Sequence, residues 1–318
     1  MLWIRRPKAW QLWKNLAVVI GVVTLLIAAP QLTLSALAES SNSPIVYTPL
    51  GPNHADCVHL IPNGSVIIGL NEIQEPNGTV VNFSPCLDPI NPASASPSAC
   101  TWNDPETAQT GSSPSYYGYF KATSTVPSNP TTTNTDWLYL WNGLLTGCSP
   151  GTDSVIQSVI QWGDANGATS GHSGWGGKWW QEETWYYLST TSYYETAPIT
   201  ISAGDSIVGT ESTSSCVGGS CDWSVSEYDT TAGIGSGMSC SNTSYICNLS
   251  EVYALIALEG GGLTSCSVLP SSSPMTFYNV LKNVAGTTLT PSWSTYADTS
   301  ICSAMSVSAS STYVSLYF

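Results

Sequence analysis

The chain has 318 residues, with 7 lysines and arginines against 21 aspartates and glutamates, so its formal net charge is −14 at pH 7. Nucleic-acid binding needs a cationic face that neutralises phosphates, so this charge excludes a nucleic-acid-binding protein. Hydrophobic residues make up 42% of the chain and charged residues only 9%, which excludes an intrinsically disordered protein.

Residues 1–38 have the three parts of an export signal. Four basic residues precede an apolar run, and the small-residue sequence Ala36-Leu37-Ala38 follows it. We therefore expect this segment to be removed and the protein to be extracellular, with no stable membrane association. A retained N-terminal membrane anchor is the alternative, because the run is nearly long enough to span a bilayer.

The charge of the exported chain suits an acidic environment. A mature chain from Glu39 keeps three lysines and all 21 acidic residues, which gives a net charge of −18. Below about pH 4 most carboxylates are protonated, so little self-repulsion remains to unfold the protein. We expect a protein that tolerates acid.

All ten cysteines follow the export signal, and an even number in an exported chain predicts disulfides. The short separations predict that Cys216 pairs with Cys221 and Cys240 with Cys247; the other pairings stay open. No C-x-x-C pair occurs, and we expect neither metal nor cofactor. The metal-like segment 54–59, which holds two histidines, an aspartate and a cysteine, is expected to be a loop beside a disulfide.

Residues 39–115 are expected to form a loop-rich leader that docks on the following domain. Its hairpin signal is Asn63-Gly64, a tight-turn pair between the apolar runs of residues 57–69. Residues 88–113 are rich in proline, alanine, serine and threonine, and predict a linker or a wrapping loop.

Residues 116–318 carry the signals of an all-β sandwich domain. Short runs rich in β-branched and aromatic residues recur between clusters of glycine, serine, asparagine and proline, and helical periodicity is scarce. The predicted strands span residues 116–126, 137–145, 154–162, 179–189, 199–201, 207–211, 223–228, 253–258, 275–281 and 312–318.

The strand at residues 154–162 carries two glutamines. Its alternation places Gln157, Val159 and Gln161 on one face. An amide is a neutral hydrogen-bond donor that can hold a developing oxyanion at any pH. The alternative is that both glutamines only form hydrogen bonds across the sheet. Conventional catalytic motifs, such as Gly-x-Ser-x-Gly or H-E-x-x-H, are absent from the sequence.

The strand at residues 178–188 carries adjacent glutamates with opposite orientations. One face has Trp180, Glu182, Thr184 and Tyr186, and the other has Trp179, Gln181, Glu183 and Trp185. The two glutamates therefore cannot act together as a carboxylate dyad. A single glutamate among aromatic rings has its pKa raised by desolvation, and can serve as general base and general acid at acidic pH. Alternatively, both glutamates are solvated and the aromatics form a core or a sugar-binding face.

Short motifs occur in a specific order along residues 116–210. They are Thr125-Val126-Pro127, Trp141-Asn142-Gly143-Leu144, Val155-Ile156-Gln157-Ser158, Trp185-Tyr186 and Ile199-Thr200-Ile201-Ser202-Ala203-Gly204-Asp205. In this order the chain resembles the acid-acting glutamic peptidases, or eqolisins. It also resembles uncharacterised secreted proteins with a Gln-Trp-Gly signature, here at residues 161–163. The resemblance implies a concanavalin-like or lectin-like sandwich of two bent antiparallel sheets with a concave binding face.

The family's catalytic pair is one glutamine and one glutamate across that face. Gln157 matches the family glutamine. The family glutamate precedes a Trp-Tyr pair, and the aligned position here is Thr184, with Glu182 and Glu183 just before it. The resemblance therefore leaves two alternatives: Gln157 acts with Glu182 or Glu183, or the catalytic glutamate is missing and the protein is a relative that is not a peptidase.

Two functions remain open at this point. The first is a monomeric acid endopeptidase, without metal or cofactor, that acts on protein or peptide substrates. Its substrate-binding residues would be Gln161, Trp141, Trp180, Thr184 and Tyr186. The second is a non-catalytic carbohydrate-binding module whose aromatic face stacks on the rings of a polysaccharide.

Overall fold

The computed structural model describes residues 43–49, 51–86, 104–111, 116–131, 137–147, 154–163, 178–188, 192–217, 220–241, 247, 251–261 and 263–318. The predicted export signal, Cys100 and Cys148 lie outside these residues. Within the described residues, no helix is long and apolar enough to cross a membrane.

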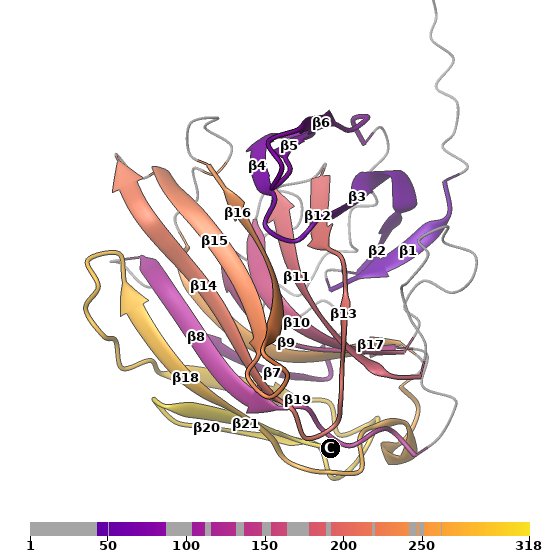
Figure 1. The fold of residues 1–318 in the computed structure, drawn as a ribbon. Helices are drawn as coiled ribbons and strands as arrows, with labels where there is room; N and C mark the ends of the chain where they lie inside the picture. Colours follow the sequence, from indigo (N-terminus) through magenta and orange to yellow (C-terminus); the bar gives the residue numbers. More distant parts are fainter. Residues whose placement is uncertain are drawn as a thin grey trace, which may run out of the picture. The chain divides into compact units, whose positions relative to one another are not determined.

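Two large β-sheets stack face to face (Figure 1). The nine-stranded sheet runs in the order β19 (Trp293–Ala297), β7 (Glu106–Thr110), β17 (Tyr253–Gly261), β9 (Trp137–Leu145), β10 (Val155–Gly163), β11 (Trp180–Leu188), β12 (Ser192–Thr196) and β3 (Val58–Ile61). Its ninth strand, β13 (Ile199–Ile201), also pairs with β11.

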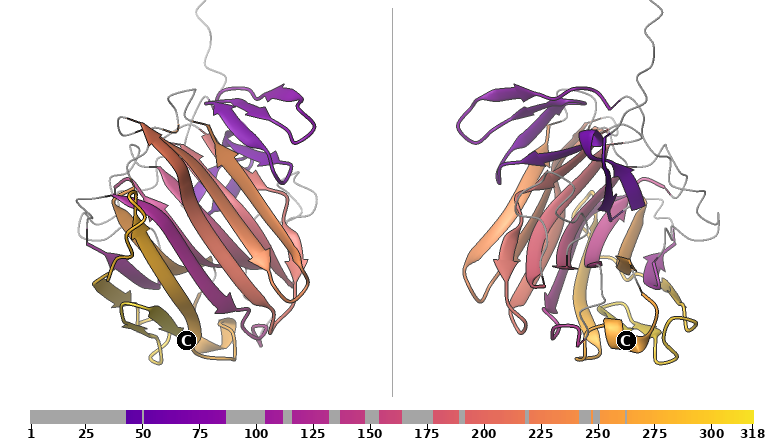
Figure 2. Two further views of the ribbon diagram at one scale, coloured as in Figure 1. Left: turned by 60° about the vertical axis from the view of Figure 1, so that its left-hand side comes forward. Right: turned by 90° about the vertical axis from the view of Figure 1, so that its right-hand side faces the viewer.

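The ten-stranded sheet forms the second layer (Figure 2, left). Its order is β20 (Ser306–Ala309), β21 (Tyr313–Tyr317), β18 (Met275–Asn283), β8 (Tyr117–Thr125), β14 (Ser206–Val217), β15 (Ser220–Asp229), β16 (Ile234–Cys240), β4 (Val66–Gly69), β5 (Glu72–Gln74) and β6 (Val80–Asn82). A separate hairpin joins β1 (Ile45–Thr48) to β2 (Gly51–His54), and the short 3-10 turns η1 (Ala55–Cys57) and η3 (Cys266–Val268) complete the described elements.

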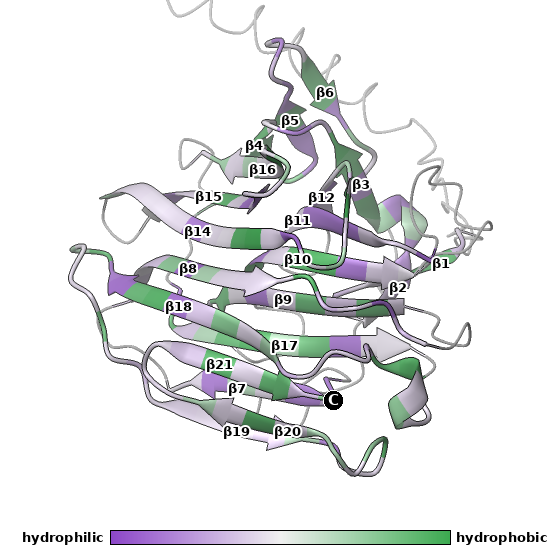
Figure 3. Ribbon diagram, turned by 60° about the horizontal axis from the view of Figure 1, so that its bottom comes forward, coloured by the Kyte–Doolittle hydropathy of each residue, from purple (hydrophilic) through white to green (hydrophobic). Residues whose placement is uncertain are grey.

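The predicted all-β sandwich is confirmed, and each of the ten predicted strands overlaps an observed one: β8, β9, β10, β11, β13, β14, β15, β17, β18 and β21. Most pairings are antiparallel, but β12 with β3 and β16 with β4 are parallel. The apolar stretches of β9 and β17 are visible as green segments in Figure 3.

The leader contributes strands to both sheets. Gly64 has the positive φ of 85° that its turn requires, but the strands on either side of the turn do not pair with each other. β3 joins the nine-stranded sheet and β4 joins the ten-stranded sheet, so the segment is a crossing between layers and not the expected hairpin. The physical reason is burial: Ile61 and Ile67 both lie in the core between the sheets. β7 forms where the composition predicts a linker, because β17 and β19 pair with it on both sides.

Four disulfides join described cysteines: Cys57–Cys86, Cys216–Cys221, Cys240–Cys247 and Cys266–Cys302. The two predicted short-range pairs are among them. The segment 54–59 contains η1 and the Cys57 disulfide, and its His59 stacks on Phe83 with ring centroids 4.3 Å apart. Burial lowers the pKa of His59 to about 4.

Two apolar clusters cover the two faces of the nine-stranded sheet. The first lies between the sheets and includes Phe120, Trp180 and Trp223. The second lies on the opposite face and includes Trp141, Trp185 and, from the β1–β2 hairpin, Val46. The hairpin is held there by Tyr139, whose hydroxyl donates a hydrogen bond to the Tyr47 carbonyl oxygen at 2.9 Å. The sheet is therefore covered on both faces.

Gly209 lies where β14 approaches the nine-stranded sheet too closely for a side chain. A Cβ atom on Gly209 of β14 would collide with the side chains of Ser158 and Asn142 in the nine-stranded sheet. We expect Gly209→Ala to lower the free energy of unfolding by about 1–3 kcal/mol, because neither neighbour has room to retreat. Urea unfolding measures this value.

Gly111→Ala is the matched control for that substitution, because a Cβ atom at Gly111 has no neighbour within 4 Å. Equal stability of the two variants would show that the sheets are not packed as described.

Candidate active site

Gln157 lies near the centre of the nine-stranded sheet. It is directly opposite Gly143 on β9 and Trp185 on β11. Its side chain is only 1% exposed and faces the second cluster, with Val159 and Trp141. The Gln157 Oε1 atom has no hydrogen-bond partner in the described part of the chain, whereas Gln161 donates to the Gly163 carbonyl oxygen at 3.3 Å. Gln157 therefore has an acceptor that the sheet does not use.

Glu183 lies on the same face as Gln157. It is directly opposite Val159, so it is a diagonal neighbour of Gln157, at roughly 7–8 Å between Cα atoms. One carboxyl oxygen accepts a hydrogen bond of 2.8 Å from the Trp185 indole nitrogen. The other has no partner among the described residues. Burial raises the pKa of Glu183 to about 8.

A third polar residue of this face, Glu195, was not predicted from the sequence. It lies on β12, directly opposite Trp185, and is fully buried. Burial raises the pKa of Glu195 well above its ordinary value, and the nearby charge of Glu183 raises it further. Glu195 directly follows Tyr193 and Tyr194, and a glutamate beside aromatic residues is the sequence pattern that singled out Glu183. The two carboxyl groups flank Trp185, and their repulsion favours a state in which one keeps a proton.

Glu182 points to the opposite face, into the space between the two sheets. It is opposite Ile160 and Ile199, both neighbours in the nine-stranded sheet. Burial, followed by the charge of Asp229 on β15, raises the pKa of Glu182 to about 8. Burial, followed by the charge of Glu182, raises the pKa of Glu227, whose carboxylate accepts a hydrogen bond of 2.9 Å from the Val159 backbone nitrogen.

The remaining candidate residues divide between the same two faces. Trp141 and Gln161 share the face of Gln157. Trp180, Thr184 and Tyr186 lie between the sheets with Glu182. Thr184 is bound through its backbone nitrogen to the Thr196 hydroxyl at 2.9 Å. The structure therefore brings Gln157, Glu183, Trp141 and Gln161 together and separates them from the other four.

A second carboxyl pair lies on the face of Gln157. Glu259 of β17 is directly opposite Tyr139, and burial followed by the charge of Asp104 raises its pKa well above the ordinary value. Glu259 is one residue beyond its predicted strand, and Asp104 lies within the segment predicted as a linker or wrapping loop, so neither was assigned a role from the sequence.

The β1–β2 hairpin closes the site. Thr48 and Pro49 approach Gln157 and Trp185, and the void left between them is about 10 Å³. A space of this volume holds at most about one water molecule. With Thr48 and Pro49 in place, nothing larger than a water molecule therefore fits in this void beside Gln157.

Comparisons with known proteins identify structural neighbours. No protein-family model and no curated protein matches the chain. Among solved structures, scytalido-glutamic peptidase with a peptide-based transition state analogue is 19% identical, with a TM-score of 0.46, over 68% of this chain and 98% of that one. The same peptidase with a transition state analogue inhibitor is 18% identical at the same TM-score and coverage. SCP-B, an eqolisin in complex with the tripeptide Ala-Ile-His, is 19% identical with a TM-score of 0.44 over the same shares.

Proposed function

We propose that the protein is a secreted, acid-acting endopeptidase that hydrolyses peptide bonds with Gln157 and Glu183. The observation that supports this most is their shared face: the buried amide of Gln157 lies diagonal to a buried carboxyl group whose pKa is raised. Disulfides among the described cysteines suit an oxidising, extracellular environment, consistent with removal of residues 1–38.

In the proposed reaction, ionised Glu183 takes a proton from water while the water oxygen attacks the peptide carbonyl carbon. The carbonyl oxygen becomes an oxyanion, to which the Gln157 amide nitrogen donates a hydrogen bond. When the tetrahedral intermediate collapses, the carbon–nitrogen bond breaks and Glu183 returns the proton to the leaving amine. Glu195, directly opposite Trp185 on β12, is a positioning residue, because repulsion from ionised Glu183 keeps a proton on Glu195.

The hairpin adds a control step to this reaction. With the face covered, the raised pKa of Glu183 keeps it protonated in acid, and a protonated carboxyl group cannot act as a base. Moving residues 43–49 away admits water, which lowers the desolvation penalty and brings the pKa of Glu183 back toward its ordinary value. Uncovering the face therefore opens access and activates the base together.

The test compares the mature chain with a shortened chain that begins at Ala55 and so lacks β1 and β2 but retains Cys57. Both are incubated with a denatured protein between about pH 2 and pH 7, with pepstatin and a chelator as inhibitors; circular dichroism checks that both are folded. We expect the shortened chain to cleave the substrate in acid at least about 10-fold faster, without inhibition by either compound. Absence of cleavage by both chains at every pH would refute the proposed function.

A further inference from the structure

The outer face of the ten-stranded sheet is the surface turned away from the nine-stranded sheet. On its strands, alternate residues such as Phe277, Phe120 and Trp223 are buried in the core between the sheets. The intervening residues therefore point outward. Six strands, β21, β18, β8, β14, β15 and β16, provide this surface, and they lie side by side in that order.

Tyrosines form the first row across the outer face. The register aligns Tyr313, Tyr278, Thr123, Val208 and Tyr228 on five successive strands. Tyr278 is 65% exposed, and Tyr228 is 47% exposed. At about 4.8 Å between neighbouring strands, the row spans roughly 19 Å. It is an exposed line with aromatic rings at both ends.

Two further rows run alongside the tyrosines and are rich in hydroxyl groups. The second row contains Val280, Lys121, Thr210, Ser226 and Gly237, and the third contains Lys282, Tyr119, Ser212, Ser224 and Ser239. The Lys282 ammonium lies over the Tyr119 ring, 5.1 Å from its centroid. Apart from Val208 and Val280, the three rows consist of tyrosine, serine, threonine, lysine and glycine residues.

The charge of the outer face differs from that of the whole chain. Glu211, Glu227 and Asp229 all belong to these strands, but each is buried and points inward. Lys121 and Lys282 point outward. Among the described outward residues of the six strands, the one carboxylate is Asp222, which accepts a hydrogen bond of 2.9 Å from Ser215. A cationic patch therefore lies on a chain with a net charge of −14.

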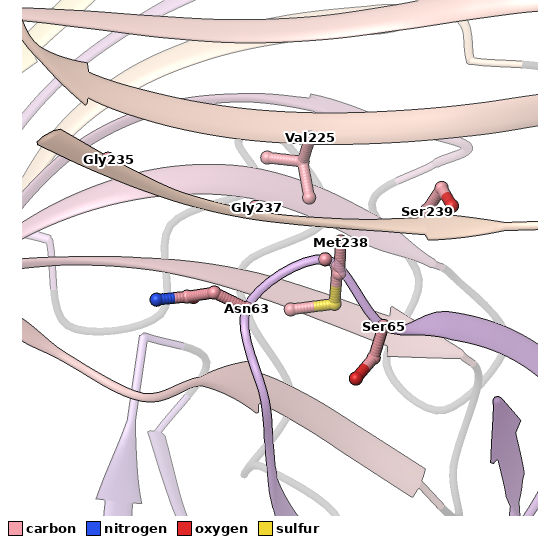
Figure 4. A pocket seen from close by; sticks show the side chains of 8 residues that line it. Asn63, Ser65, Val225, Gly235, Gly237, Met238 and Ser239 are labelled. Carbon is pink, nitrogen blue, oxygen red and sulfur yellow. The ribbon is translucent and has the colours of Figure 1, made fainter. Parts of the chain in front are cut away.

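A groove of about 430 Å³ lies at the β16 end of these rows (Figure 4). Gly235 and Gly237 leave the strand without side chains there, and Ser239 borders the same groove. Asn63, from the turn between β3 and β4, also lines the groove, although its Oδ1 atom is itself buried. The rows thus end at a recess that the polar residues Asn63 and Ser239 border.

We propose that the outer face binds a polysaccharide that carries carboxylate groups. Pyranose rings present an apolar face that stacks on tyrosine, and their hydroxyls match the serine and threonine rows. The two lysines supply charge complementarity to uronate carboxylates, and the groove at Asn63 receives one end of the chain segment. This site is on the other sheet from Gln157, so binding would attach the protein to an anionic polymer without blocking the candidate active site.

Affinity electrophoresis of the mature chain through gels that contain polygalacturonate tests the proposal at about pH 6, where uronates are ionised. We expect retardation that weakens with salt, and at least about 10-fold weaker binding by the variant Tyr278→Ala/Tyr313→Ala. The variant Lys121→Ala/Lys282→Ala should lose most of the salt dependence. Tyr296→Ala is the matched control, because Tyr296 is 50% exposed but lies on β19 of the other sheet, and it should bind as the parent does.

Several results would overturn the proposal. The first is that polygalacturonate does not retard the parent chain, and the second is that the tyrosine variant binds as tightly as the parent. The third is that uncharged hydroxyethyl cellulose retards the parent as much as polygalacturonate does and that the lysine variant binds like the parent. Tighter binding to vesicles of phosphatidylcholine and phosphatidylglycerol than to polygalacturonate would assign the face to a membrane instead. Peptidase activity is not a readout, so failure here leaves the proposed function standing.

Discussion

The free energy of unfolding is expected to fall as the pH rises from about 4.5 to about 8. Burial raises the pKa values of Glu106, Glu182 and Glu183 to about 8 in the folded protein, from an ordinary value of 4.5. Between these pH values the native state keeps protons that the unfolded state releases. The stabilisation is therefore complete below the ordinary pKa and is lost as the pH rises through the folded pKa. Each group contributes a slope of about 1.4 kcal/mol per pH unit.

Further buried glutamates act in the same direction. Glu195, Glu211, Glu227 and Glu259 all have pKa values raised well above the ordinary value, in each case mainly by burial. Most of the described carboxyl groups are thus interior groups whose protonation favours the folded state in acid, and the acid tolerance expected from composition stays a prediction.

Thermal melts between about pH 3 and pH 8 measure this dependence. Glu106→Gln should flatten the curve, because it removes one buried titrating group. Asp298→Asn is a control at a carboxyl group outside the core, where the pKa is instead lowered by hydrogen bonds from Ser300. A melting temperature that rises steadily toward pH 8 would contradict the assignment of buried, protonated carboxyl groups.

Substitution of the adjacent glutamates should have opposite consequences. In the uncovered chain, Glu183→Gln is expected to lower kcat/KM by roughly 100-fold to 10,000-fold, because it removes the proposed base. Glu182→Gln should leave kcat/KM within about 3-fold, since its side chain lies between the sheets. It should also stabilise the protein at neutral pH, because it removes one carboxyl group from the neighbourhood of Asp229 and Glu227. Peptide cleavage kinetics and melts at about pH 4 and pH 7.5 measure both effects.

The pair also serves as its own control, because both substitutions replace a buried glutamate with an isosteric amide one residue apart. Loss of activity in both variants would indicate a general folding defect. Loss in Glu182→Gln alone would place the chemistry between the sheets and contradict the proposed site.

The orientation of the two glutamates is a local property, which is why the sequence could predict it. Period-two alternation separates Glu182 from Glu183 in any regular strand, and the register confirms that separation. The same alternation correctly places Gln157 and Gln161 on one face. The disulfide between Cys216 and Cys221 is also local, because its two residues are directly opposite each other in the β14–β15 pair.

The rest of the candidate site depends on long-range pairing that local patterns do not encode. Glu195 reaches the site because the five-residue strand β12 pairs with β11, and the local sequence pattern does not encode which strand β12 joins. The cover over Gln157 depends on where the β1–β2 hairpin docks, more than 100 residues earlier in the chain. The Asn63-Gly64 turn was recognisable, but which sheets its two strands join depends on burial of Ile61 and Ile67.

We propose that Gln157 and Glu183 hydrolyse peptide bonds once the β1–β2 hairpin has moved away from their face of the sheet. The most direct test is mass spectrometry of a denatured protein after incubation, at about pH 3, with the chain that begins at Ala55 and with its Glu183→Gln variant. We expect new peptide termini with the former and almost none with the latter. Equal cleavage by both chains, or cleavage by neither, would contradict the proposal.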